Sequence, residues 1–229
     1  MASDNKNQQQ TEETTIDTLD RNLQEMGRQV AVNKTALYVA FGAIIVIAAA
    51  TLGYIYFLRN PKIEKSYEAY NKVETVAMGN DSLAAAQYKQ VADQYSGTDA
   101  GNLAALSAAE ALYNTGKYEE AAKYLKDFKT KDEVLAANAE ILLGDCYVNI
   151  KKYDLALEAF TTAVRKGEGN PQIVPRALLK KAVVYDAQKK YADALECYNI
   201  IKRDFPKFQL GNGISIDSYI EREQARLGK

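Results

Sequence analysis

Asp145 and Cys146 are the residues whose types most suggest a reactive site. They are adjacent in ILLGDCYVNIKKYDLALEAF, residues 141–160. A thiolate can act as a nucleophile or as a metal ligand. The 229-residue chain contains no histidine, so it lacks the usual base for cysteine and serine nucleophiles and the commonest zinc ligand. Cys197 is the one other cysteine, which excludes a four-thiolate metal site. We therefore do not expect an enzyme. An unrecognised enzyme would need a cleft that contains acidic side chains with perturbed pKa values.

Other sequence signals for cofactor or nucleic-acid chemistry are also absent. Neither GxxxxGK[ST] nor GxGxxG occurs. Acidic pairs such as Glu119-Glu120 are adjacent, so they point in different directions on a helix and are expected to be solvated. The formal net charge is -1, with 29 basic and 30 acidic side chains, and this balance does not favour nucleic acid as a partner. We expect no cofactor, no metal and no small-molecule substrate.

A repeated pattern, Tyr-x-x-Ala-x-x-x-aromatic, organises the second half of the chain. It occurs as YEEAAKYL from Tyr118, YDLALEAF from Tyr153 and YADALECY from Tyr191, so the copies begin 35 and 38 residues apart. That period is typical of a solenoid unit built from two helices. A degenerate fourth copy is expected upstream, around Ala84 and Tyr88. The spacing predicts an all-α domain of about nine helices from near Pro61 to Leu227.

The middle copy closely resembles the tetratricopeptide repeat. The family pattern, L-G-x-x-Y followed by A-x-x-x-F-x-x-A, is occupied here by Leu143, Gly144, Tyr147, Ala156, Phe160 and Ala163. The small Gly144 and Ala156 should let the two helices of the unit approach, while Tyr147 and Phe160 fill the gap. Cys146 falls where the repeat takes a small buried residue, so we predict a packed, inert thiol. The predicted fold is a tetratricopeptide-repeat-like helical solenoid of about three to four repeats with a C-terminal capping helix.

Two further features concern the ends of the predicted repeats. The stretch GEGNPQ, residues 167–172, lengthens the spacing before the last copy and is expected to form a loop. After the Gly-rich link at 210–213, Ser215 or Asp217 can cap the closing helix.

The amino-terminal part has a different composition. Residues 1–34 form a polar tail, expected to be partly disordered, with a short pattern at Ile16, Leu19, Leu23, Met26 and Val30. This pattern fits a loose amphipathic helix, a partner or dimer contact, or coincidence. Residues 35–58 contain no charge and are long enough for a transmembrane helix. A cleaved signal peptide is the competing interpretation, but the apolar run continues beyond Ala50, which favours an uncleaved anchor. The third segment, 61–229, holds the repeats.

A stack of repeats suggests a protein-binding groove lined by the first helix of each unit. Chaperone-binding repeats that hold a peptide carboxylate use lysine and asparagine on this face, and the equivalent columns here carry Leu, Ile, Glu, Asp and Val. Recognition of an acidic carboxy terminus is therefore disfavoured, and apolar or basic segments suit the strip better. The alternative is a solvent-facing strip with no dedicated ligand. The inward positions are Leu103, Leu106, Glu110, Tyr113, Asn114, Asn138, Ile141, Asp145, Val148, Asn149, Arg176, Leu179, Val183 and Asp186.

The layout of tail, span and repeats is also similar to a narrower family. The stretch QYSGTDAGNLAALSAAEALYNTGKYEEAA, residues 94–122, and the SYIERE ending resemble YfgM-like single-pass inner-membrane proteins of bacteria, in particular members from the Bacteroidetes. A short tail before the span and a large domain after it are typical of a signal anchor with a cytoplasmic N-terminus. The resemblance implies a periplasmic repeat domain. It also implies a chaperone-like role beside the Sec translocon, with translocon subunits, a membrane-anchored prolyl isomerase and unfolded secretory chains as partners. The lysine and arginine count on the two sides of the span does not decide the orientation.

A second hypothesis comes from a different class of function. The same groove would serve a structural envelope scaffold that joins division or outer-membrane assembly factors and has no chaperone action. The number of different partners discriminates between the two hypotheses, because a chaperone meets many unrelated chains and a scaffold meets a fixed few.

Overall fold

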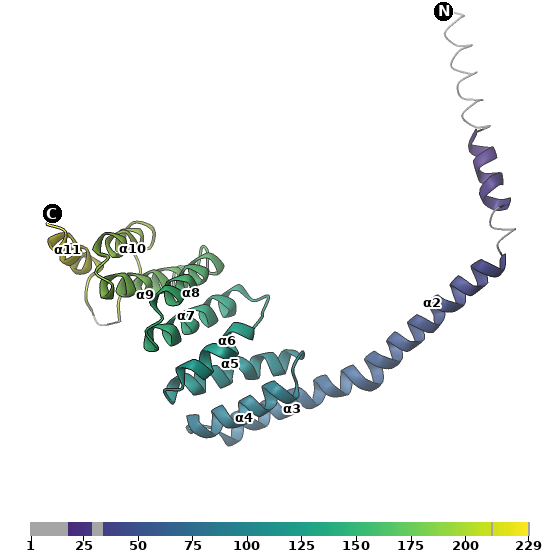
Figure 1. Ribbon diagram of the computed structural model, residues 1–229, viewed down its shortest axis with the longest axis horizontal. Coiled ribbons are helices and arrows are strands. Elements are labelled where there is room, and N and C mark those ends of the chain that lie inside the picture. The colour runs from purple at the N-terminus through teal and green to yellow at the C-terminus, as the bar shows by residue number, and fades with distance from the viewer. Residues whose placement is uncertain (1–17, 29–33, 212, 229) are drawn as a thin grey trace, which may run out of the picture. The chain divides into compact units, whose positions relative to one another are not determined.

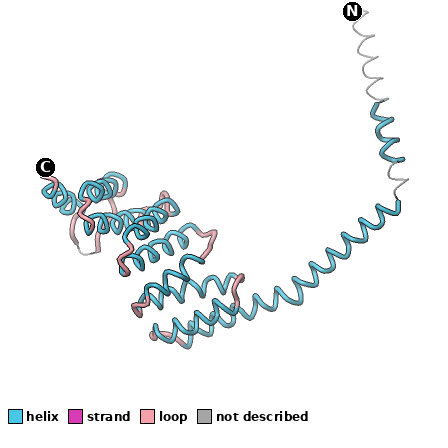
Figure 2. Tube along the Cα trace, in the orientation of Figure 1, coloured by secondary structure: helices cyan, strands magenta, loops and turns pink. Residues whose placement is uncertain are grey.

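The computed structural model describes residues 18–28, 34–211 and 213–228. Within these ranges the chain contains helices and connecting turns and no β-strand, as Figure 2 shows. Contacts divide the chain into two compact units, 1–61 and 62–229. The all-α prediction is confirmed, and each unit is described separately.

The first unit contains helices that bury none of their described apolar side chains. Residues 18–28 are helical, with Leu19, Leu23 and Met26 each more than half exposed, whereas Ile16 and Val30 lie outside the described residues. Helix α2, Lys34–Tyr54, continues into a π-helical turn, η1, Ile55–Arg59. The helix that begins at Lys34 is long and apolar enough to cross a membrane by length and composition.

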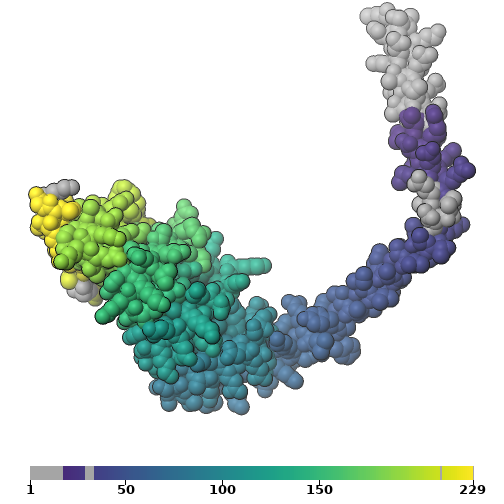
Figure 3. All heavy atoms as spheres, in the orientation of Figure 1, coloured from purple at the N-terminus to yellow at the C-terminus, as the bar shows by residue number. Residues whose placement is uncertain are grey.

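The second unit is a series of antiparallel helix pairs. Its helices are α3 Asn60–Val76, α4 Asp81–Gln94, α5 Asp99–Asn114, α6 Tyr118–Asp127, α7 Glu133–Asn149, α8 Tyr153–Lys166, α9 Ile173–Ala187, α10 Tyr191–Asp204 and α11 Ile216–Arg226. Each helix packs against the next from α4 to α11 (Figure 1). We call α3, α5, α7 and α9 the A helices and α4, α6, α8 and α10 the B helices. In the space-filling view, the colours of the second unit run in chain order from blue through green to yellow (Figure 3).

Side-chain caps explain where several helices begin. Thr98 accepts a hydrogen bond from the Gly101 amide at 3.0 Å, and Asp132 accepts one from the Leu135 amide at 2.9 Å. At α11 the cap is Ser215, whose hydroxyl accepts from the Asp217 amide at 3.2 Å. Such caps satisfy amides that have no partner inside the helix. Of the two predicted caps for the last helix, Ser215 is therefore the one used, and residues 167–172 form the predicted loop.

The turn from each A helix to its B helix has the same geometry in the three repeats. Gly116, Lys151 and Lys189 occupy equivalent positions with φ of 78°, 59° and 59°. At the second of these turns, the Lys151 amide donates to the Val148 carbonyl and the Lys152 amide to the Tyr147 carbonyl. This is the Schellman arrangement, which requires a left-handed residue after the helix. Glycine meets that requirement without strain, and lysine does so at a cost.

Replacing Lys151 with glycine is therefore expected to stabilise the protein. A left-handed L-residue costs about 1–2 kcal/mol, and glycine loses part of that gain through the entropy of the unfolded chain, so the net increase in unfolding free energy is about 0.5–1 kcal/mol. Urea unfolding of the full chain in detergent measures it. Lys152→Gly is the matched control, because Lys152 has φ of -90° and gains no such relief. An equal or larger stabilisation from the control would contradict this explanation.

A glycine brings α7 and α8 into close contact. A Cβ atom on Gly144 would come within 2.4 Å of the Phe160 ring. Phe160 and Ala156 are fully buried, and Tyr147 lies beside them with 9% of its surface exposed. Tyr147, Ala156 and Phe160 belong to one hydrophobic cluster that extends from α4 to α9. The predicted roles of Gly144 and Phe160 in this helix pair are confirmed.

Candidate functional site

A cavity opens on the A helices, and its walls come from three successive repeats. It has a volume of about 290 Å³. We call it the A-helix cavity; its lining is Leu106 and Glu110 from α5, Leu135, Asn138, Ala139, Ile141, Leu142 and Asp145 from α7, and Arg176 and Lys180 from α9. Six of the fourteen predicted groove residues therefore line one cavity.

The floor of the cavity is apolar. Leu106 and Ile141 are 7% and 5% exposed, and both belong to the main hydrophobic cluster. Leu142 and Leu135 are half-buried and pack against the same cluster. The floor is thus fixed by the packing of the repeats and does not depend on mobile side chains.

Polar side chains at the α9 end of the cavity are paired across repeats. The Lys180 ammonium donates to the Asp145 carboxylate at 2.8 Å, and Arg176 donates to the Asn138 side chain. Burial raises the pKa of Asp145, while the hydrogen bond and charge of Lys180 and the charge of Arg176 lower it. The carboxylate and its lysine therefore neutralise each other inside the groove.

Glu110 stands at the α5 end of the cavity and differs from Asp145. It is exposed at the rim, and burial raises the pKa of its carboxyl with no opposing contribution from a cation. Among the described residues, Glu110 forms no hydrogen bond or ion pair. The two equivalent acids of the groove thus have different electrostatic surroundings.

Tyr113 and Asn149 lie next to the cavity and not in its lining. Burial raises the pKa of Tyr113, the charge of Asp145 raises it further, and a hydrogen bond with Asn149 lowers it. The Tyr113 ring also packs edge-on against Tyr118, with 5.3 Å between ring centres. These contacts continue the groove from the cavity toward the turn between α5 and α6.

The remaining predicted positions are placed apart from the cavity. Val183 is 52% exposed. Besides Tyr113, Asn149 and Asp186, five predicted residues fall outside the cavity lining, which are Leu103, Asn114, Val148, Leu179 and Val183. The apolar part of the groove is therefore shorter than the predicted strip.

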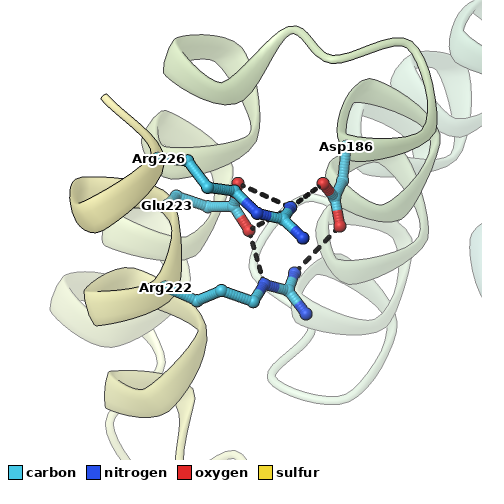
Figure 4. A network of polar contacts seen from close by, with 4 residues as sticks. All are labelled: Asp186, Arg222, Glu223 and Arg226. Carbon is cyan, nitrogen blue, oxygen red and sulfur yellow. Dashed lines mark hydrogen bonds and ion pairs between the residues drawn. The ribbon is translucent and has the colours of Figure 1, made fainter. Parts of the chain in front are cut away.

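Asp186 is held by the last helix and is not open to a ligand. Its carboxylate accepts from Arg222 at 3.0 Å and also from Arg226 (Figure 4). The same two arginines contact Glu223, which is fully buried and lies 2.8 Å from the Arg222 Nε atom. Helix α11 packs against α10, and its two arginines reach across to the Asp186 carboxylate on α9, which is therefore not free for a ligand.

Sequence reasoning missed four lining residues, Leu135, Ala139, Leu142 and Lys180. Lys180 follows the predicted Leu179 by one position, and Asp145 lies 35 residues before it. A search for opposite charges one repeat apart would have found this pair. The three apolar residues had no such signal, because they are also expected in the core of a helix pair.

The two thiols are buried inside helix pairs and lack the properties of nucleophiles. Cys146 is fully buried and Cys197 is 5% exposed. Burial raises the pKa of Cys146 to about 12 and that of Cys197 to about 11. Both thiols therefore stay protonated at neutral pH, and the thiolate is the reactive form.

We expect neither thiol to react with Ellman's reagent at pH 8 in the folded protein, and both to react once urea unfolds it. The raised pKa and the closed packing act in the same direction. The measurement is the release of the reagent's chromophore by the full chain in detergent, with and without urea. Fast release of one equivalent without urea would contradict the assignment of both thiols to the core.

The helix pairs, their repeated turns and the groove on the A helices define a helical-repeat protein, a class whose groove binds other proteins. The family model for the tetratricopeptide repeat-like domain matches residues 31–199 of the sequence, so the chain belongs to that family.

Two known proteins are similar to this chain. An "Ancillary SecYEG translocon subunit" of Neisseria gonorrhoeae is 26% identical over 178 residues, which are 75% of this chain and 82% of the relative. The crystal structure of the MamA protein superposes with a TM-score of 0.55 and 22% identity, covering 73% of this chain and 83% of the other. The second likeness concerns the fold alone.

Proposed function

We propose that this chain is a single-pass inner-membrane protein whose periplasmic repeat domain binds segments of unfolded proteins as they leave the Sec translocon. The observation that carries the proposal is the A-helix cavity on a repeat domain whose relative is named as an ancillary translocon subunit. Translocon subunits and a membrane-anchored prolyl isomerase are the stable partners that fit this role, and secretory chains are the transient ones.

The dimensions of the cavity suit a side chain of a polypeptide. Its volume of about 290 Å³ lies at the lower end of the range for small-molecule sites, about 300–1,000 Å³. Leu106, Ile141 and Leu142 offer apolar surface to one or two apolar side chains of an extended segment. A contact of this size is weak and reversible, which suits brief binding of many different chains.

The membrane anchor proposed for the chain is α2. Its residues carry no charge after Lys34, and none of them is buried against the rest of the structure. A hydrocarbon core is about 30 Å thick, which about 20 helical residues cross, and α2 has 21 residues. With the short tail in the cytoplasm, the repeat domain emerges on the periplasmic side.

Protease added from the periplasmic side tests the anchor and the orientation together. In cells with a permeabilised outer membrane and an intact inner membrane, we expect the repeat domain to be digested and a short fragment with α2 to remain. Digestion of a cytoplasmic marker is the control for leakage. Full protection of the repeat domain would overturn both the localisation and the role in secretion.

A fixed envelope scaffold is the second candidate, and one observation favours it. Asp145 and Asp186 already have cationic partners within the chain, so a large part of the predicted groove is occupied by internal contacts. A groove with one short open cavity is what a scaffold with a single well-matched partner needs. The number of different partners captured at the cavity distinguishes the two candidates.

A further inference from the structure

Equivalent positions of successive repeats show that one ion pair of the groove is incomplete. Asp145 on α7 pairs with Lys180 on α9. One repeat earlier, Glu110 on α5 is the counterpart of Asp145, and Leu142 on α7 is the counterpart of Lys180. The acid is thus retained in the earlier repeat, but a leucine stands where its cation would be. All four residues line the same cavity.

The Glu110 carboxylate has no cationic partner within the described residues, so a cation from outside the chain can pair with it. Lys180 and Arg176 lie at the α9 end, and the charge of each acts on Asp145. Partial burial of an unpaired carboxylate is unfavourable, so a purely apolar occupant that covered Glu110 would increase that cost. An acidic occupant would add repulsion. A basic side chain supplies the missing charge.

We propose that Glu110 binds the lysine or arginine side chain of the bound polypeptide segment and so makes the cavity selective for basic–apolar sequences. This inference rests on the proposed function, because it assumes that a polypeptide enters the cavity. The methylene stem of lysine or arginine packs on Leu106 and Leu142, and its charged end reaches the Glu110 carboxylate at the rim. A neighbouring apolar side chain of the segment contacts Ile141 on the floor.

Leu142 is a determinant of this selectivity as much as Glu110 is. With lysine at this position, Glu110 would have an internal partner like that of Asp145, and its carboxylate would no longer be open to a cation from outside the chain. The pair Glu110 and Leu142 therefore makes this repeat a binding site for a basic residue, while Asp145 and Lys180 close the next one.

The test compares three fluorescein-labelled peptides, GALAXALAG, with lysine, glutamine or glutamate at X. Their binding to the full chain in detergent is measured by fluorescence anisotropy. We expect the lysine peptide to bind about tenfold more tightly than the glutamine peptide, as for a hydrogen bond to a charged group, and the glutamate peptide to bind most weakly. Glu110→Gln should remove the preference for lysine, so that the lysine and glutamine peptides bind with equal affinity.

Two further variants separate charge at this site from charge in general. Leu142→Lys should weaken binding of the lysine peptide about tenfold, because the new lysine pairs with Glu110. Glu158→Gln removes an exposed acid from α8 and should change nothing. Circular dichroism and the thermal midpoint of each variant show that it is folded.

The outcomes distinguish this inference from the proposed function. Equal affinity for the lysine and glutamine peptides, with no effect of Glu110→Gln, would overturn the role of Glu110 while groove binding stands. Equal losses from Glu110→Gln and Glu158→Gln would also overturn it, because they indicate a general charge effect. Failure of all three peptides to bind would overturn the proposed function and this inference with it.

Discussion

Replacement of Phe160 with alanine is expected to lower the free energy of unfolding by about 3–5 kcal/mol. The ring is fully buried between α7 and α8 and packs directly over Gly144. Truncation leaves a cavity between the two helices, and the glycine opposite has no side chain to fill it. Urea unfolding of the full chain in detergent, followed by far-ultraviolet circular dichroism, measures the loss.

Adding a side chain at the same contact is also expected to lower the free energy of unfolding. Gly144→Leu places a side chain where a Cβ atom alone would be 2.4 Å from the Phe160 ring, so α7 and α8 have to separate. Leu155→Ala on α8 is the matched control, because Leu155 is 41% exposed and its loss should cost less than about 1 kcal/mol. A loss at Phe160 no larger than that at Leu155 would contradict the central place of this contact in the repeat.

Replacement of Glu223 with alanine is expected to loosen α11 and to lower the unfolding free energy by about 2 kcal/mol. Loss of one partner of a buried ion pair typically costs about 3–5 kcal/mol. The effect here is smaller because Arg222 and Arg226 are 39% and 38% exposed and keep Asp186 as a partner. The four charges lie between α9 and α11, as Figure 4 shows, so the loss should be concentrated in the last helix.

Hydrogen exchange read by mass spectrometry locates this effect. Amides of residues 216–226 should exchange faster in Glu223→Ala, while those of α5 and α7 should keep their protection. Glu221→Ala is the control, because Glu221 is exposed on the same helix and should leave exchange unchanged. Unchanged protection of α11 in Glu223→Ala would show that the network does not hold this helix in place.

The helical part of the structure could be predicted because its signals are local and repeated. Columns 35 and 38 residues apart place each turn, and the buried positions Gly144, Phe160 and Ala163 follow from the matched family pattern. The left-handed lysines at 151 and 189 were less visible, since glycine is the usual signal for that conformation and these two turns carry lysine in its place.

Side-chain pairing in the groove could not be predicted in the same way. Asp145 was expected to face a partner, and the structure pairs it with Lys180 from the next repeat. Asp186 was placed in the groove by its column, but α11 lies outside the repeat and its two arginines reach that carboxylate. A long charged side chain can reach several neighbours in space. The period of the sequence therefore predicts its position within the repeat but does not predict its partner.

Capture of partners at the cavity in living cells tests the central claim most directly. A photoreactive phenylalanine analogue at Tyr113, which lies beside Asp145, should form light-dependent adducts with many unrelated secretory chains, and these should disappear when translation is stopped. The same analogue at Leu155 on α8 serves as the control for surface collisions. A single stoichiometric partner at Tyr113, or a set of adducts no different from that at Leu155, would contradict a groove that binds emerging chains.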